Sequence, residues 1–429
     1  MRASVLLITA FAVLPALGDG QVPSDPELLK AFKAWWALPA DGRASTPVPG
    51  KALPDLSKAS AQAWRLRLWE AAVQAAKAQK RPKPSPEAIP GLPKDATFGA
   101  VSAGGQTLRY TLRAVGKKPK TGWPLYINFH GGGQDKAIND YAWSLAQTQY
   151  PVKEGLYLCP RAPRDVYECW LEPPVYELLD ALLRELFLLQ DVDPDRVYIM
   201  GYSLGGYGTL FLAPYMADRW AAAASSAGGG TRGENMPLAN LRNTPLMSQI
   251  GTVDNEGVPR YETAKAYAEA LKALRDQDPK GYVLEYREHP GKGHKIDDRD
   301  TPDWLAKFTR DPVPERLVWE VLTAPNSEVF ALPGPGRFAW LGIDEPQHGQ
   351  KVTAWREGNT IHLEAQGVPK LILFLDDRMV NLDQPVRVLS GDREVFHGTV
   401  PRRLETLAET QAERGDPARA FCARIEVEP

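Results

Sequence analysis

One serine lies in a sequence setting that can turn its hydroxyl into a nucleophile. The run Gly201-Tyr-Ser203-Leu-Gly205 directly follows the apolar stretch Arg196–Met200 and opens a helical pattern, so Gly-x-Ser-x-Gly stands between an expected strand and an expected helix. The glycines leave room for neighbouring backbone at a sharp turn, and the helix N-terminus favours developing negative charge. A serine placed in this way predicts acyl transfer, provided that a base lies beside it.

The base is expected to be a histidine from a loop further along the chain. Two of the six histidines follow Ser203 within the region of alternating strands and helices. His289 ends an expected strand, whereas His294 lies in the loop Gly291-Lys-Gly-His beyond it. Catalytic residues of open α/β sheets gather in such loops, outside the carboxyl ends of the strands, which favours His294 over His289.

An acid that orients the imidazole should follow another strand, between the serine and the histidine. The expected strand Pro245–Ile250 is followed by Gly251-Thr-Val-Asp254-Asn-Glu256. We predict Asp254 as this acid, with Glu256 as the alternative. The resulting order along the chain is serine, acid, histidine.

A glycine run supplies a candidate oxyanion hole. The segment Phe129-His-Gly-Gly-Gly133 ends an apolar stretch, and glycines allow backbone N–H groups to approach a substrate oxygen closely. We predict that the N–H groups of Gly132, Gly133 and Leu204 bind the oxyanion. His130 is expected to brace this loop and to take no part in proton transfer.

The elements that must position these residues fall into four regions. Residues 1–18 combine a basic start, an apolar run and small residues, the layout of a secretory signal peptide, which predicts an exported (secreted or periplasmic) protein. Residues 19–94 are expected to form a helical segment, with helices over 24–38 and 56–80, that ends in a Pro-rich linker. Residues 95–315 are expected to form an α/β domain and residues 316–429 a β-rich domain.

Short apolar stretches alternate with helical patterns between residues 95 and 315. Such alternation predicts a mostly parallel sheet covered by helices on both faces. The segment Gln106–Ala114 alternates more clearly and is expected to be an antiparallel edge strand. The expected strands are 123–129, 155–159, 196–200, 220–225, 245–250 and 282–288, and the expected helices are 141–150, 175–189, 204–216, 261–274 and 302–309.

After Glu315 short strands predominate, and turn residues join them. Gly391-Asp392 has the character of a hairpin turn. The expected strands are 337–342, 352–355, 360–364, 371–375, 386–389, 394–400 and 420–427, and a helix is expected over 402–414. Packing of this region against the α/β domain is favoured over the binding of a polymer.

These motifs, taken together, resemble the α/β-hydrolase superfamily, and they are most similar to secreted bacterial esterases of the dienelactone-hydrolase and polyhydroxybutyrate-depolymerase type. The resemblance rests on Phe129–Gly133, on Asp193–Gly206, on Gly251-x-x-Asp254 and on Gly291–His294. It covers about half of the chain. It implies an eight-stranded fold, a catalytic triad and a two-step acyl transfer, and it does not extend to the N-terminal helices or to the C-terminal region.

Composition excludes several other classes of protein. The 51 Lys and Arg residues balance 53 Asp and Glu residues, so no basic excess favours nucleic acid. No stretch reaches the ~20 apolar residues of a membrane span. The acidic run Asp191–Asp195 lacks the Gly and Glu of a calcium loop, no zinc motif is present, and we expect neither metal nor cofactor.

Two further questions are left open by the sequence. Trp170 lies in a loop between a strand and a helix and is a candidate wall of the substrate pocket. Cys159 and Cys169 are close enough in sequence to form a disulfide in an exported protein, and Cys422 would then be unpaired.

The sequence therefore predicts an exported serine hydrolase of carboxylic esters. Two alternatives are a peptidase that uses the same triad and a binding protein built on an inactive hydrolase scaffold. The sequence does not identify the substrate, a small molecule or a polymer, nor the oligomeric state.

Overall fold

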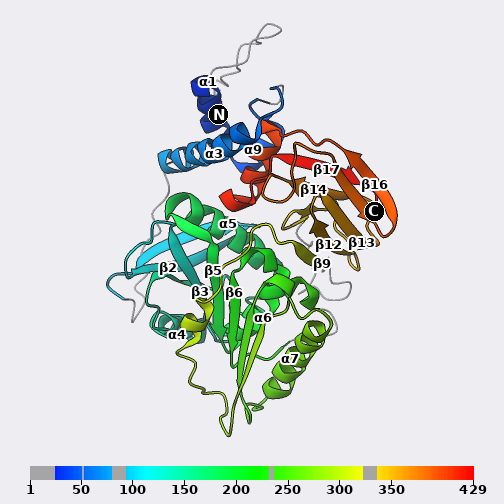
Figure 1. Cartoon of the computed structure of the whole chain (residues 1–429). Coiled ribbons are helices and arrows are strands. Elements are labelled where there is room, and N and C mark those ends of the chain that lie inside the picture. The colour runs from blue at the N-terminus through cyan, green and yellow to red at the C-terminus, as the bar shows by residue number, and fades with distance from the viewer. Residues whose placement is uncertain (1–24, 51–52, 80–92, 231–235, 322–335) are drawn as a thin grey trace, which may run out of the picture.

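The computed structural model describes residues 25–50, 53–79, 93–230, 236–321 and 336–429. The expected signal peptide (residues 1–18) lies outside these residues, as does nearly all of the Pro-rich linker. Figure 1 shows the α/β region in cyan to yellow-green, with the N-terminal helices and the C-terminal region above it.

The centre of the molecule is an eight-stranded sheet. Its strands follow the order β1-β2-β4-β3-β5-β6-β7-β8. β2 is antiparallel to β1 and to β4, and all pairs from β4 to β8 are parallel. The strands are β1 (Thr97–Ala103), β2 (Gln106–Val115), β3 (Trp123–Phe129), β4 (Gly155–Arg161), β5 (Val192–Tyr202), β6 (Ala222–Ser226), β7 (Leu246–Gly251) and β8 (Leu284–His289).

Helices cover both faces of this sheet, which confirms the predicted fold class. Alternate strand residues point to opposite faces and so build two separate clusters. In one cluster Tyr126 and Tyr157 pack with Trp143 of α4 and Trp304 of α8; the other cluster holds the buried faces of α5, α6 and α7. The helices are α4 (Lys136–Ala146), α5 (Pro173–Leu189), α6 (Leu204–Tyr215), α7 (Arg260–Gln277) and α8 (Thr301–Leu305).

The prediction that Gln106–Ala114 forms an edge strand is wrong. β2 lies between β1 and β4, and β1 is the edge. The sequence of β1, Thr-Phe-Gly-Ala-Val-Ser-Ala, is poor in large apolar residues and carries little strand signal. Its Gly99 faces the ring of Tyr110, where a Cβ would approach to 2.1 Å, so a small residue is required at the site of pairing.

The two predicted candidates for a disulfide, Cys159 and Cys169, are free and buried. Cys159 belongs to the cluster on one face of the sheet and Cys169 to the cluster on the other face. The backbone therefore keeps the two thiols apart, although they are near in sequence. Cys422 is also free and buried.

In its described residues, 316–321 and 336–429, the C-terminal region contains two small sheets and one α-helix. Their strand orders are β10-β11-β14-β17 and β16-β15-β13-β12-β9. The predicted strand 337–342 is instead two strands of two residues each, because Ala339 adopts φ 52° between them. The elements are β9 (Arg316–Glu320), β10 (Arg337–Phe338), β11 (Leu341–Gly342), β12 (Lys351–Glu357), β13 (Thr360–Gln366), β14 (Leu371–Leu375), β15 (Val386–Ser390), β16 (Arg393–Gly398), α9 (Leu404–Arg414) and β17 (Ala423–Val427).

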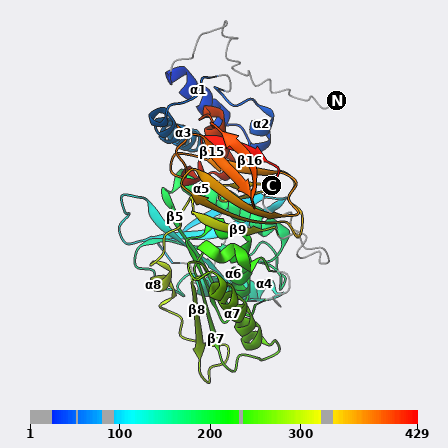
Figure 2. The same cartoon turned by 45° about the vertical axis from the view of Figure 1, so that its right-hand side comes forward.

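Three N-terminal helices pack across the other two regions, as Figures 1 and 2 show. They are α1 (Asp25–Trp36), α2 (Ala40–Ser45) and α3 (Lys58–Ala78). α3 contacts α5 and α9, and its Arg65 donates a hydrogen bond of 2.7 Å to Asp376. None of the helices in the described part of the chain has the length and apolar character needed to span a membrane.

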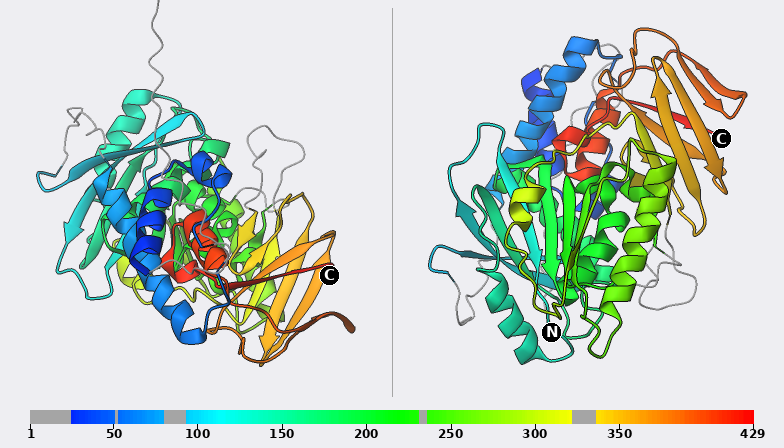
Figure 3. Two further views of the ribbon diagram at one scale, coloured as in Figure 1. Left: turned by 90° about the horizontal axis from the view of Figure 1, so that it is seen from above. Right: turned by 60° about the horizontal axis from the view of Figure 1, so that its bottom comes forward.

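The C-terminal region packs against the end of the sheet that is opposite to Ser203. Its Asp416 accepts a hydrogen bond from Arg310, which also binds Asp195 near the start of β5. Ser203 follows the last residue of the same strand, eight residues after Asp195, which corresponds to about 26 Å at ~3.3 Å per residue. The views in Figure 3 agree with this placement, since the C-terminal sheets lie beside one end of the α/β region.

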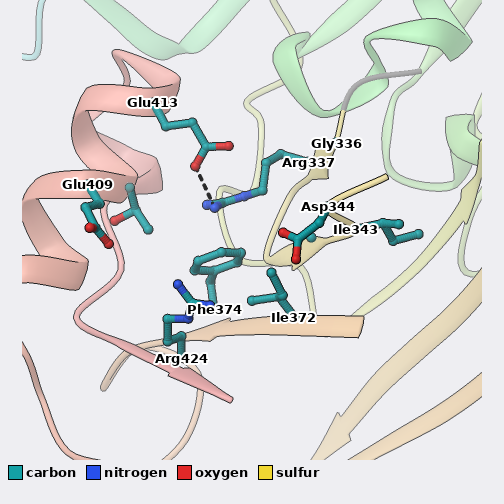
Figure 4. Close-up of a pocket in the computed structure, with 11 residues that line it drawn as sticks. Gly336, Arg337, Ile343, Asp344, Ile372, Phe374, Glu409, Glu413 and Arg424 are labelled. Carbon is teal, nitrogen blue, oxygen red and sulfur yellow. Dashed lines mark hydrogen bonds and ion pairs between the residues drawn. The ribbon is translucent and has the colours of Figure 1, made fainter. Parts of the chain in front are cut away.

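A cavity of about 270 Å³ lies within the C-terminal region, between the four-stranded sheet and α9. Figure 4 shows that Arg337 reaches across it to Glu413, at 2.6 Å, while its guanidinium stacks on the ring of Phe374. The residues that line this cavity lie between Gly336 and Arg424 in the sequence, and none of the predicted site residues is among them.

Candidate active site

Ser203 stands at a strained turn between β5 and α6. Its backbone has φ 57° and ψ −122°, a conformation that non-glycine residues rarely adopt. The flanking glycines are required by space: a Cβ on Gly205 would lie 1.9 Å from the carbonyl oxygen of Phe129, and a Cβ on Gly201 would lie 2.3 Å from that of Gly205. The turn therefore forms only with glycine at both positions.

The structure brings together the three residues predicted to form the triad. His294 Nε2 lies 2.8 Å from Ser203 Oγ, and His294 Nδ1 lies 2.9 Å from Asp254 Oδ2. The residues come from three loops at the carboxyl ends of β5, β7 and β8. Asp254 is 1% exposed, whereas the His294 side chain is 38% exposed, so the imidazole is open to an incoming substrate while the carboxylate is shielded.

The two alternatives to these residues make other contacts. His289 lies at the end of β8, with its Nε2 3.3 Å from the side-chain oxygen of Gln249. Glu256 is exposed to solvent, and its backbone carbonyl accepts a hydrogen bond from Arg260. Neither side chain takes part in the contacts between Ser203, His294 and Asp254.

The strand order decides the fold when it is combined with a serine turn after β5. In this order β2 pairs antiparallel with both β1 and β4, ahead of the parallel strands from β4 to β8. This region has the α/β-hydrolase fold. The order serine, acid, histidine along the chain is also that of α/β-hydrolases.

Comparisons with known proteins find likeness in structure alone. No protein-family model matches the chain, and no curated protein sequence matches it. A thermostable esterase is similar over 50% of this chain, which covers 63% of that protein, less than two thirds of its length, at 21% identity and a TM-score of 0.41. LpqC, a poly(3-hydroxybutyrate) depolymerase from Bordetella parapertussis, is 17% identical over 50% of this chain and 92% of its own, with a TM-score of 0.37. Esterase 2 of Thermogutta terrifontis is 18% identical over 53% and 95%, with a TM-score of 0.35.

The glycine loop lies against Ser203, but its three glycines have different surroundings. A Cβ on Gly131 would lie 3.9 Å from Ser203 Oγ, so this backbone borders the hydroxyl. Gly132 has φ 131° and comes next along the loop. The Gly133 N–H donates to Asn139 Oδ1 at 2.9 Å, so the prediction that it binds an oxyanion is wrong for this structure. Leu204 is the first residue of α6, where backbone N–H groups have no partner within the helix.

Asn139 holds the glycine loop in place, and sequence reasoning missed it. Besides accepting from Gly133 N–H, its amide donates to the Gly133 carbonyl at 2.9 Å and to Asp165 at 2.8 Å. It is fully buried on the same face of α4 as Trp143. A polar residue on the apolar face of an amphipathic helix was the available signal, because such a group needs buried partners.

His130 and Trp170 support the loop from behind. His130 Nε2 accepts from the Ala162 N–H at 3.0 Å, and Nδ1–H donates to the Gly131 carbonyl. The indole of Trp170 donates to the His130 carbonyl at 2.9 Å and is 1% exposed. The prediction that Trp170 lines the substrate pocket is therefore wrong, because the side chain is buried beneath the glycine loop and against Gly208.

We expect His130 to make the stability of the protein sensitive to acid. Burial, reinforced by the positive charge of Arg161, lowers the pKa of His130 from 6.5 to about 4. Between pH ~6.5 and ~4 the unfolded chain therefore binds a proton that the folded chain does not, and folding free energy is lost as the pH falls, by up to about 3 kcal/mol. Urea unfolding at several pH values measures this loss.

Two histidine variants isolate the contribution of His130. His130→Asn should be less stable at pH 8 but should lose less stability than the wild type between pH 6.5 and 4. His348→Asn, which alters an exposed histidine, should follow the wild-type curve. Parallel curves for the wild type and His130→Asn would contradict the assignment.

A second set of contacts holds the His294 loop. The Tyr202 hydroxyl donates to the His294 carbonyl and accepts from the Ile296 N–H at 3.2 Å. Further along the loop, the Tyr150 hydroxyl donates to the buried carboxylate of Asp298 at 2.6 Å. Nothing in the sequence pattern links these residues, because Tyr150 and Asp298 are 148 positions apart.

Exposed apolar side chains lie next to the predicted site residues. Tyr167 is 55% exposed, and its ring lies 3.4 Å from the point where a Cβ on Gly133 would be. Val253, next to Asp254, is 57% exposed. The surroundings of the site are thus partly apolar, which suits a substrate with hydrocarbon or aromatic groups. Within the described residues no group of His, Cys, Asp or Glu is arranged to hold a metal ion.

Proposed function

We propose that this protein is a serine hydrolase that cleaves carboxylic esters, with Ser203 as nucleophile, His294 as general base and acid, and Asp254 as the orienting acid. The observation that carries the proposal is the position of the His294 imidazole, which contacts Ser203 Oγ with one nitrogen and Asp254 Oδ2 with the other. This is the arrangement that makes a serine hydroxyl nucleophilic.

The reaction has two steps. Ser203 Oγ attacks the ester carbonyl while His294 Nε2 takes the hydroxyl proton, and the tetrahedral oxyanion collapses as the same proton passes to the departing alcohol oxygen. A water molecule, deprotonated by His294, then attacks the acyl-enzyme and releases the carboxylic acid and Ser203. Asp254, shielded from solvent, keeps Nδ1 protonated and so leaves Nε2 free to act as a base.

The oxyanion is bound, in this proposal, by the N–H groups of Leu204 and Gly132. Leu204 follows the nucleophile at the N-terminus of α6, and Gly132 lies between Gly131, which borders Ser203, and Gly133, whose N–H is bound to Asn139. Each correctly placed donor contributes about 3–4 kcal/mol to lowering the barrier.

Labelling with a fluorophosphonate tests the proposal directly. We expect one adduct on each chain, located at Ser203 by peptide mapping, and hydrolysis of 4-nitrophenyl esters that stops once labelling is complete. An adduct at another residue would refute Ser203 as the nucleophile. The absence of any adduct on folded protein would also refute it, and would favour a binding protein on an inactive scaffold. Cleavage of peptides without cleavage of esters would favour a peptidase that uses the same three residues.

We further propose that the protein is exported. The basic start, the apolar run and the small residues Ala16-Leu-Gly18 support this proposal.

A further inference from the structure

The buried acid Asp254 has a second charged partner. Its Oδ2 contacts His294, while its Oδ1 accepts a hydrogen bond of 3.3 Å from Nη1 of Arg260, the first residue of α7. The same Nη1 donates to the backbone carbonyl of Glu256 at 3.1 Å, so the guanidinium spans the loop that carries Asp254. The Arg260 side chain is 19% exposed and Asp254 is 1% exposed, so this ion pair lies largely out of water.

We propose that Arg260 is a positioning residue that holds the Asp254 carboxylate turned toward His294 and sets how readily the imidazole takes up a proton. This inference rests on the proposed function.

The physical reason is the geometry of one carboxylate between a guanidinium and an imidazole that becomes charged during the reaction. In a carboxylate that is shut off from water, an oxygen without a donor is costly, so Arg260 stabilises the orientation in which Oδ2 faces His294. Its positive charge also opposes the charge that His294 acquires when it takes the serine proton. Arg260 Nη1 and His294 Nδ1 contact the two oxygens of this carboxylate at 3.3 and 2.9 Å. At a separation of at most about 8 Å and an effective dielectric of about 40, a unit charge shifts the pH at which the imidazole takes up a proton by roughly 0.5–1 unit.

Other groups near His294 come from several elements. Tyr202 and Ser203 contact it from the end of β5, Asp254 from the loop after β7, and Asp298 lies beyond Tyr202 on the His294 loop. Two exposed lysines, Lys292 and Lys295, flank it in sequence. Arg260 is the cation that hydrogen-bonds to the Asp254 carboxylate, and all of the other groups are retained in the variants proposed below.

The test is the pH profile of kcat/KM for ester hydrolysis. In Arg260→Gln, which removes the charge but keeps a donor, protonation of His294 becomes easier, so the acid limb should move to higher pH by about 0.5–1 unit. In Arg260→Lys, which keeps the charge, the limb should stay in place, while kcat falls several-fold because the lysine stem is one bond shorter and more flexible, so its ammonium holds the carboxylate less precisely than the guanidinium does.

Arg387→Gln is a matched control, because it removes an arginine paired with a carboxylate at the surface of the C-terminal region. It should leave both the limb and kcat unchanged. If Arg260→Gln does not fold, Arg260→Met, which retains more of the apolar stem, replaces it in the same measurement. A folded, neutral variant at position 260 with an unmoved limb, or a lysine variant shifted as far as the neutral one, would overturn the inference.

Failure of this inference and failure of the proposed function have different signatures. If Ser203 is labelled and esters are hydrolysed but the limb does not respond to the charge at position 260, only the role of Arg260 is refuted. If no ester is hydrolysed and Ser203 is not labelled, the proposed function itself is refuted, and the role of Arg260 is refuted with it.

Discussion

Replacement of Ser203 by alanine is expected to lower the kcat of ester hydrolysis by about 10⁴–10⁶-fold. Without Oγ there is no acyl-enzyme, and only binding and the oxyanion donors remain to accelerate direct attack by water. The midpoint of thermal unfolding should change little, because the side chain contributes one hydrogen bond, of about 1 kcal/mol, to a half-exposed imidazole. Steady-state kinetics and a melting curve on the same sample measure both quantities.

The partners of Ser203 provide the internal control. His294→Ala should cost nearly as much as Ser203→Ala, and the double variant should be no slower than either single variant, because the residues act as one unit. Ser102→Ala, in which a serine exposed on β1 loses its hydroxyl, should keep full activity. Substantial ester hydrolysis by purified Ser203→Ala protein would show that another group is the nucleophile.

The parts of the site that could be predicted from the sequence are those fixed by local geometry. The turn around Ser203 requires glycine at 201 and 205, because backbone atoms of β3 and α6 lie within 2.3 Å of any Cβ there. Both glycines are two positions from Ser203, so the motif can be recognised in the sequence. The boundaries of β3, Trp123–Phe129, agree with the prediction because the strand is buried from its second residue onward and ends at the glycine run. The positions of Asp254 and His294 followed from the rule that loops at the carboxyl ends of parallel strands converge.

The remaining features depend on contacts between distant segments. Gly133 was expected to donate to an oxyanion, but Asn139 on the next helix binds its N–H, and the sequence does not show which side chain faces which amide. Trp170 was a candidate for the pocket wall, but it lies under the loop, since only the packed structure places it against Gly208. The contact between Arg260 and Asp254 could not be predicted, because the sequence does not show that the Arg260 side chain reaches back to the Asp254 carboxylate.

The same limit applies to the relation between the regions. The short expected strands and turn residues after Glu315 predict a β-rich region, but they do not show where this region packs. The structure joins it to the α/β region through buried ions: Arg414, Asp416 and Arg419 meet Asp218, Arg219 and Arg310. In sequence these residues have the appearance of ordinary surface charges, and only their almost complete burial shows that they lie between regions. Because this contact is at the end of the sheet remote from Ser203, it favours support of the fold over contact with substrate.

Replacement of Asp416 by asparagine should therefore destabilise the whole protein, by about 3–5 kcal/mol. Asp416 is fully buried and receives a hydrogen bond of 2.8 Å from Arg310, with Arg219 at 4.0 Å. Burial alone would raise the pKa of this carboxyl, but Arg310, Arg219 and Arg419 outweigh it and hold the pKa below its usual value. Without the carboxylate, these three guanidiniums are left in a dry interior with too little negative charge to balance them.

Because the cluster joins both regions, the loss should appear as a single cooperative unfolding transition at lower urea concentration, in which ester hydrolysis and far-UV circular dichroism are lost together. Asp55→Asn is a matched control: Asp55 pairs with Arg403 at 2.8 Å, but its side chain is 57% exposed, and an exposed pair of this kind contributes at most about 1 kcal/mol. Two separate transitions in the Asp416 variant, with activity surviving the first, would show that the α/β region folds without the support of the C-terminal region. A stability equal to that of the wild type would show that the buried arginines find other counter-charges when Asp416 is neutral.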